Sequence, residues 1–350
     1  MSNFPRTVFG YEIDVHRNEN DFEIKVPAFP KISSRSNSLG RAIRDLWPRV
    51  QAEIDAIEVS GKSPPKTLFE GKYHDAVSKR LVDVNRFISQ YGFCAIGDLT
   101  TPELATLEGI VKGLRGSHPS PPSDPAARMV IENMIFSGIK NIVIGPHLRA
   151  ANVAGLWMKV PALKKFSHIV ESSNLLYYRS DYIPLVLTLV PIIEGTLLSW
   201  YGYDYARDKM PNESKLLNFM VEQFPTKPKG NHPLIWEEYV RSFVYIYENI
   251  FYGTHQKAHD DLFFNRHYVA HGMGEGWFYH RNNVCKLTLL LDLLAHIVAD
   301  STGCHDRFNV SDAEMKPHEE CYNKMLNFYL QASFGEEDLL KRHSFYKGKV

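Results

Sequence analysis

Residues 287–298 read Leu287-Thr288-Leu289-Leu290-Leu291-Asp292-Leu293-Leu294-Ala295-His296-Ile297-Val298. Apolar residues occupy almost every position of this run, so a helix formed by it is apolar around most of its circumference. A helix of that kind belongs in the interior of a protein, where its neighbours cover every side. We therefore expect a core helix at about residues 283–300.

More helices are expected on the N-terminal side of this run, where apolar residues follow a helical period. Their approximate ranges are 183–202, 213–223, 235–252 and 256–271, with a turn from Pro225 to Pro233. Consecutive helices of this length imply a helical bundle over residues 181–305. A C-terminal helical extension is expected over residues 306–350.

The N-terminal part begins with β-forming residues. Val8–Val15 and Phe22–Val26 lie on either side of a polar segment, a pattern typical of a β-hairpin. From Ser38 the apolar residues recur with a helical period until Gly61 and Pro64, and Pro48 is expected to kink this helix.

Further helices are expected before residue 180. One covers Tyr73–Gln90, and another follows Thr100, a capping residue, and ends near Gly113 to Gly116. Residues 126–179 are expected to be helical, with breaks at Gly145-Pro146 and Pro161.

The proline-rich segment 117–125 is the most linker-like part of the chain, since four prolines in nine residues prevent regular structure. We expect it to be a hinge or a long surface loop. The predicted fold class is mainly α: a mostly helical N-terminal domain with a small β-hairpin, over residues 1–180, and a helical bundle over residues 181–305. We expect the N-terminal domain to recognise a target or to regulate the bundle.

Composition excludes several classes of protein. The 350 residues are 44% hydrophobic and 23% charged, which is ordinary for a soluble globular protein. Lysine plus arginine equal aspartate plus glutamate at 40 each, so any contact with nucleic acid must be local. The four cysteines are scattered and the N-terminus lacks the pattern of a secretory signal, which favours a reducing, cytoplasmic setting.

The apolar stretch 183–201 approaches the length of a membrane span. Glu194 within it would cost a few kcal/mol in hydrocarbon, and Pro184 and Pro191 weaken the helix. We therefore expect a buried helix of a soluble bundle and no membrane partner.

Histidines gather in one short region. Five of the fifteen lie between residues 255 and 280: His255, His259, His267, His271 and His280. In the expected helix 256–271, His267 and His271 share one face, and Gly272 ends the helix just after them. A histidine in the last turn is favoured in its protonated form by the helix dipole, which suits a general acid.

The stretch Phe264-Asn265-Arg266-His267-Tyr268-Val269-Ala270-His271-Gly272 resembles the Arg-x4-His signature of the HEPN superfamily, in its form with Asn before Arg and Gly after His. Upstream, Ile193-Glu194-Gly195 resembles the apolar-Glu-Gly of the first helix of the HEPN bundle. Downstream, Asn283 and the leucine-rich run that follows it resemble the closing helix. The resemblance covers roughly residues 183–300.

The resemblance implies a metal-independent endoribonuclease that needs no cofactor and whose active site is shared by the two protomers of a homodimer. RNA is the implied substrate, and an antitoxin or sensor protein is an implied partner. Arg266 and His271 are the implied catalytic residues, in an antiviral defence, abortive-infection or toxin system. His267, Asn265, Glu194 and Asn283 are given supporting roles.

The chemistry of these two residues fits that activity. In metal-free RNA cleavage the 2′-hydroxyl attacks phosphorus, so the enzyme must transfer a proton and stabilise charge on the phosphate oxygens. His271 exchanges protons near neutral pH, and the Arg266 guanidinium can hold two phosphate oxygens. The expected products carry a 2′,3′-cyclic phosphate and a 5′-hydroxyl.

Other interpretations of the same residues stay open. Glu194 can pair with Arg266, or it can bond to a buried tyrosine or to backbone. The motif is equally compatible with a catalytically silent module that binds nucleotides, RNA or a partner protein. A metal-dependent hydrolase using His255 and His259 is the enzymatic alternative, and Asp292, His296 and Asp300 also share one helical stripe suited to metal.

Overall fold

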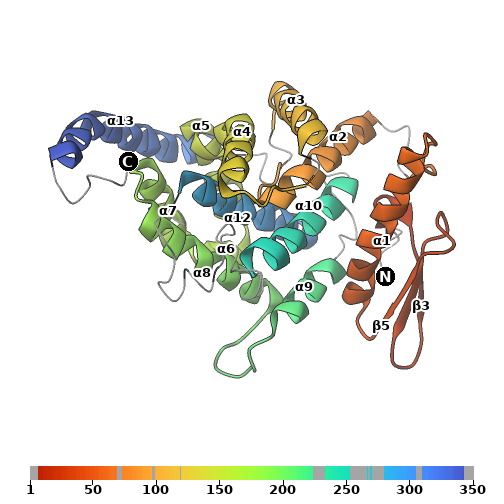
Figure 1. The fold of residues 1–350 in the computed structure, drawn as a ribbon. Helices are drawn as coiled ribbons and strands as arrows, with labels where there is room; N and C mark the ends of the chain where they lie inside the picture. Colours follow the sequence, from red (N-terminus) through yellow and green to blue (C-terminus); the bar gives the residue numbers. More distant parts are fainter. Residues whose placement is uncertain are drawn as a thin grey trace.

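The computed structural model of the chain describes residues 7–68, 73–96, 99–118, 120–223, 233–252, 266, 269, 280–304 and 310–342, and its fold is mainly α, as predicted (Figure 1). The strands are β1 (Thr7–Val8), β2 (Tyr11–Glu12), β3 (Asp14–Arg17), β4 (Phe22–Lys25) and β5 (Ser33–Ser36). The helices up to the middle of the chain are α1 (Leu39–Val59), α2 (Tyr73–Ile88), the 3₁₀ turn η1 (Ser89–Tyr91), α3 (Thr101–Ser117), α4 (Pro125–Ile144), α5 (Pro146–Asn152), the π turn η2 (Val153–Trp157), α6 (Pro161–Lys164) and α7 (Ser167–Tyr178). They are followed by α8 (Tyr182–Tyr201), α9 (Glu213–Glu222), α10 (Pro233–Ile246), the π turn η3 (Tyr247–Phe251), α12 (Arg281–Thr302) and α13 (Asp312–Arg342).

Helix α12 is the centre of the fold, and the expected core helix is confirmed. Every residue from Asn282 to Asp300 is buried, because α4, α8, α10 and η2 pack around the helix. Burial of each leucine contributes about 1.5–3 kcal/mol relative to exposure. The helix begins after His280, whose side chain accepts a hydrogen bond from the Asn282 amide, and ends at Gly303 in a left-handed conformation (φ 75°).

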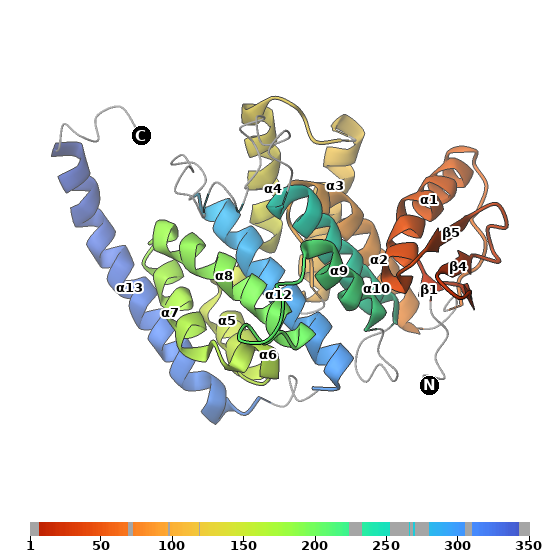
Figure 2. The same cartoon turned by 90° about the horizontal axis from the view of Figure 1, so that it is seen from below.

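Figure 2 shows α12 running through the middle of the molecule, with the strands and α1 at one end and α13 along the other. Helix α13 packs against α5 and α7. Helix α2 packs against α3 and α10, and α1 packs against α9. The first fifty residues therefore contact helices that follow residue 210 in the sequence.

The expected N-terminal hairpin is confirmed between β3 and β4, in which Val15 pairs with Ile24. The expected first strand, Val8–Val15, is however divided. Phe9 and Gly10 both have positive φ (54° and 76°), so the chain turns sharply between β1 and β2. Strand β5 pairs with β4 and was not predicted, because its sequence Ser-Ser-Arg-Ser lacks β-forming side chains.

The breaks in the helical regions follow the prolines and glycines as expected. Thr100 and Glu103 form a capping box at the start of α3. Pro146 begins α5 and Pro161 begins α6. The proline-rich segment connects α3 to α4, two helices that pack against each other, and Asp124 caps α4 by accepting hydrogen bonds from two backbone amides.

One hydrophobic cluster extends from β1 to α12. It contains residues on both sides of the expected boundary at 180/181, including Leu46, Trp157 and Leu289. The described residues on the two sides thus share a core. The division into domains at residue 181 stays a prediction.

Helix α8 is apolar and long enough to cross a membrane by length and composition, the one such helix in the part of the chain that the structure describes. It packs against α7 and α12, with Leu189 and Ile193 buried, whereas Ile183 and Leu187 are exposed. It includes Pro191, and Glu194 forms an ion pair within the molecule. Its contacts are those of a bundle helix.

Glu237 of α10 holds the sharp turn between β1 and β2 in place. Its carboxylate accepts hydrogen bonds from the Thr7 hydroxyl (3.0 Å), from the Gly10 amide (3.3 Å) and from the Phe9 amide. Phe9 lies in the left-handed region, which costs a non-glycine residue on the order of 1–3 kcal/mol. These three bonds offset that cost.

The Glu237 carboxyl gives the fold a pH dependence. Burial raises its pKa from 4.5 to about 7, although its hydrogen bonds act in the opposite direction. The folded chain then holds the proton more tightly than the unfolded chain, so this group lowers stability progressively as pH rises from about 4.5 to about 7. The Gln side chain of Glu237→Gln cannot titrate. We expect the stability advantage of wild type over Glu237→Gln to shrink by roughly 2 kcal/mol between about pH 5 and pH 8.

Urea unfolding of both proteins at the two pH values measures this difference, and contributions from other titrating groups cancel in the comparison. The glutamine offers one acceptor oxygen fewer at either pH, which changes the free energy of unfolding of the variant by the same amount at both. A difference between the two proteins that does not change with pH contradicts the raised pKa.

Candidate functional site

Three of the six residues expected at the site lie among the described residues: Glu194, Arg266 and Asn283. Asn265, His267 and His271 lie outside them, as does most of the expected helix 256–271. Arg266 and Val269 are helical, and Val269 is buried.

Glu194 and Arg266 form the ion pair that the sequence analysis offered as one of two interpretations. The Arg266 Nε donates to Glu194 Oε1 at 2.5 Å, and each side chain is 23% exposed. The tyrosine interpretation also holds, because the Tyr252 hydroxyl donates to the same Glu194 oxygen. One carboxylate therefore binds both an arginine and a tyrosine.

The ring of Tyr252 also contacts the arginine directly. The Arg266 Cζ lies 4.3 Å from the centroid of the Tyr252 ring, a cation–π contact. Burial raises the pKa of the Tyr252 hydroxyl, which keeps it protonated and able to donate to Glu194. The guanidinium of Arg266 is thus held from one edge and from one face.

The π turn η3 places Tyr252 at this position. It extends α10 by a wider turn, and the Tyr252 amide bonds to the Tyr247 carbonyl at 2.7 Å. The rings of Tyr247 and Tyr252 lie 4.5 Å apart and their hydroxyls interact. Single π turns inside helices are frequent at functional sites.

The distal edge of the Arg266 guanidinium has no partner among the residues that the structure describes, since only Nε forms a hydrogen bond there. That edge carries Nη1 and Nη2, the pair of donors that fits two oxygens of a phosphate or carboxylate. Glu194 therefore fixes the near edge of the guanidinium, and no described residue occupies the far edge.

Glu213 of α9 adds a titrating carboxyl that the sequence analysis missed. Burial and the nearby charge of Glu248 raise its pKa to about 7, while Arg44 and Arg266 act in the opposite direction. Arg44 of α1 in turn forms an ion pair with Glu248. No motif marks these residues, because they come from three helices distant in sequence.

Asn283 belongs to another group of buried polar side chains. Its side-chain oxygen accepts a hydrogen bond from Lys286 Nζ at 3.3 Å, and Lys286 also pairs with Glu132 at 2.7 Å. Glu132 pairs with Arg128 at 3.1 Å. Lys286, to which Asn283 is bonded, therefore ties α12 to α4, and the supporting role of Asn283 in the site stays a prediction.

The polar residues along one side of α12 were considered as a metal site, and one of them, Asp292, instead forms structural contacts. Both oxygens of Asp292 accept hydrogen bonds, from Arg149 and from the Trp157 indole, which leaves this carboxylate unsuited to bind metal. The ring of His296 lies 5.7 Å from that of Tyr239. Among the described residues no three His, Cys, Asp or Glu side chains are grouped to hold a metal ion. His255 and His259 lie outside those residues.

Chemically, the described part of the site offers a positioned guanidinium with one free edge and, nearby, a carboxyl that titrates close to neutral pH.

Comparison of the chain with protein-family models, with curated proteins and with solved structures finds no match.

Proposed function

We propose that the protein is a metal-independent endoribonuclease of the HEPN type, with Arg266 and His271 as its catalytic residues. The observation that carries the proposal is how Arg266 is positioned: Glu194 binds Nε, Tyr252 lies against the guanidinium face, and among the described residues Nη1 and Nη2 have no partner, which suits them to bind a phosphate. An arginine fixed in this way stabilises transition-state charge without having to reorganise during the reaction.

In the proposed reaction the 2′-hydroxyl oxygen of RNA bonds to the adjacent phosphorus, and the bond from phosphorus to the 5′-oxygen of the next nucleotide breaks. The 2′-hydroxyl proton passes to solvent water, and protonated His271 delivers a proton to the leaving 5′-oxygen. Arg266 binds the phosphate oxygens as negative charge builds on them. Glu194 and Tyr252 position Arg266 and do not touch the RNA.

The same resemblance leads us to propose a homodimer with a shared site, a cytoplasmic location, a role in antiviral defence or a toxin system, and an antitoxin or sensor as partner. The neutral net charge means that any RNA contact is local, since no overall positive field attracts nucleic acid. Charge-neutral chains depend on a few well-placed cations for such contacts.

The test compares three substrates of one sequence in EDTA: all-RNA, all-DNA, and RNA with a single 2′-deoxy substitution at the mapped cleavage position. We expect cleavage of the RNA in EDTA, a 2′,3′-cyclic phosphate on the product, and no cut at the 2′-deoxy position. Chelation that abolishes cleavage supports the metal-dependent alternative instead. Binding of RNA without cleavage supports the silent module.

A further inference from the structure

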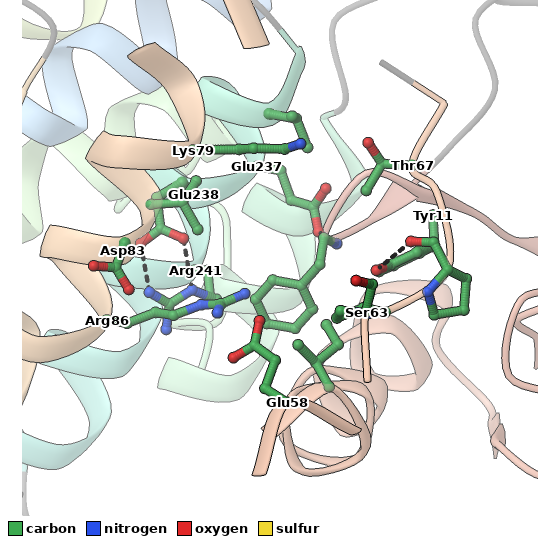
Figure 3. Close-up of a pocket in the computed structure, with 16 residues that line it drawn as sticks. Tyr11, Glu58, Ser63, Thr67, Lys79, Asp83, Arg86, Glu237, Glu238 and Arg241 are labelled. Carbon is green, nitrogen blue, oxygen red and sulfur yellow. Dashed lines mark hydrogen bonds and ion pairs between the residues drawn. The ribbon is translucent and has the colours of Figure 1, made fainter. Parts of the chain in front are cut away.

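A cavity of about 390 Å³ lies at the end of the molecule that holds the strands and α1, away from α13. The turn between β1 and β2, the end of α1, residues 63–67, α2 and α10 surround it (Figure 3). A second cavity of about 950 Å³ shares Phe9, Arg86 and Arg241 with it. Both volumes are in the range of small-molecule sites.

Arg86 of α2 lines this cavity and has no counterion among the residues that the structure describes. Its Nε is completely buried and has no hydrogen-bond partner among the described residues, and no carboxylate there lies within ion-pair distance. Burial lowers the pKa of the Arg86 guanidinium, while Glu238, Asp55 and Asp83 act on it only at longer range. Arg86 as a whole is partly exposed, so its unpaired charge costs less than a fully buried one, and an anion in the cavity would bind to the exposed part of the guanidinium.

Three of the carboxylates around Arg86 are engaged elsewhere, whereas Glu58 also lines the cavity and is exposed. Glu238 accepts hydrogen bonds from Arg241 and from the Ser242 hydroxyl, and it is 2% exposed. Glu237 binds the turn at Phe9 and Gly10. Asp83 pairs with Arg115 at 2.8 Å. None of these three engaged acids is left to neutralise Arg86.

The strained turn places the Phe9 ring close to two cations. The Arg86 Cζ lies 5.0 Å from the centroid of the Phe9 ring, and the Arg241 Cζ lies 5.9 Å from it. Figure 3 shows Arg86 and Arg241 beside each other, with Arg241 bonded to Glu238. Lys79 lines the same cavity from α2. Backbone strain of the kind seen at Phe9 is concentrated at ligand-binding positions.

We propose that this cavity binds a small organic phosphate, with the phosphate on Arg86 and the organic part against Phe9, Tyr11 and the prolines at 64 and 65. A phosphate monoester carries up to two negative charges and three acceptor oxygens, which suits the grouping of Arg86, Arg241 and Lys79. A single carboxylate needs only one guanidinium, as Glu238 already shows on Arg241. The site is independent of the proposed ribonuclease activity.

Calorimetry at constant ionic strength, using the full chain, tests the proposal with four probes: adenosine 5′-monophosphate, ribose 5-phosphate, inorganic phosphate and adenosine. We expect at least one of the two organic phosphates to bind more tightly than inorganic phosphate, and adenosine not to bind. Arg86→Met should weaken that binding about 10- to 100-fold, the loss expected for a charge-assisted hydrogen bond. Binding of neither organic phosphate, or equal binding by wild type and Arg86→Met, overturns the proposal.

Thermal unfolding in phosphate-free buffer distinguishes a ligand-binding role from a structural one. Because Arg86→Met removes a partly buried charge that has no ion-pair partner among the described residues, we expect its thermal midpoint to equal or exceed that of wild type. Arg241→Met is the matched control, and its thermal midpoint should fall because Glu238 loses its ion-pair partner and keeps only the Ser242 hydroxyl. A midpoint of Arg86→Met as low as that of Arg241→Met shows that Arg86 is structural and overturns the proposal.

Discussion

Asp292→Ala should lower the free energy of unfolding by about 3–5 kcal/mol, the cost of breaking a buried ion pair from one side. Arg149 donates to both Asp292 oxygens, at 2.6 and 2.8 Å, and the Trp157 indole donates to one of them at 2.8 Å. Asp292 is completely buried and Arg149 is 1% exposed. Removing the carboxylate leaves the guanidinium without a counterion and without access to water.

Urea unfolding of wild type and variant measures the loss. Asp21→Ala is the matched control, because Asp21 also pairs with an arginine, at 2.7 Å to Arg35, but the arginine is 66% exposed. We expect little change there, since water and salt screen an exposed pair. The double variant Arg149→Met with Asp292→Leu should recover most of the loss. A loss in Asp292→Ala no greater than in Asp21→Ala contradicts the assigned energetics.

This pair also explains why one apolar helix contains an aspartate. Arg149 lies in α5 and Trp157 in the π turn η2, so the Asp292 carboxylate joins both elements to α12. The Arg149 Cζ lies 4.3 Å from the Trp157 ring centroid, which packs the two donors on each other. The sequence shows that Asp292 needs a partner, but it does not indicate a partner 143 residues away.

Helices could be predicted in this chain because their signals are local. Apolar periodicity, the capping box at Thr100 and the breaks at Pro146 and Pro161 all act within one or two turns. The π turns η2 and η3 were not predicted, since the wider turn depends on the packing of the side chains around it. Tyr252 therefore could not be assigned to the site.

The N-terminal strands show the opposite case. Strand β5 forms because its backbone pairs with β4, and its serines carry no signal of that. The turn at Phe9 depends on Glu237, 228 residues away, and a phenylalanine is not a residue that predicts a left-handed turn. For the same reason the sequence gives no sign of the cavity around Arg86.

At the proposed ribonuclease site, Glu194 and Arg266 were predicted together because a carboxylate in an apolar helix needs a partner and the motif supplied one. Glu213 and Arg44 carry no such signal. Their charges act on the site only because α1, α8 and α9 meet beside it.

Arg266→Ala should reduce kcat/KM for RNA cleavage in EDTA by about 10²–10³-fold, the usual cost of removing one positioned donor to a developing oxyanion. Arg266→Lys should reduce kcat/KM nearly as much, because an ammonium keeps the charge but does not offer two donors in a fixed plane. His271→Ala should reduce kcat/KM by about 10²–10⁴-fold, as expected for a proton-transfer group. Initial rates on a labelled RNA measure each effect. Arg207→Ala, which removes an arginine that is 84% exposed, is the control for loss of charge alone.

Glu194→Gln and Tyr252→Phe separate the positioning of Arg266 from its chemistry. Glutamine keeps an acceptor for Nε but loses the charge, whereas phenylalanine keeps the ring against the guanidinium and loses only the hydroxyl. Because neither residue touches RNA in the proposed mechanism, both variants should lower kcat with little change in KM, and Glu194→Gln should lower it more. Full activity in Glu194→Gln would show that the ion pair does not position Arg266. A wild-type cleavage rate in Arg266→Ala would show that Arg266 is not a catalytic residue.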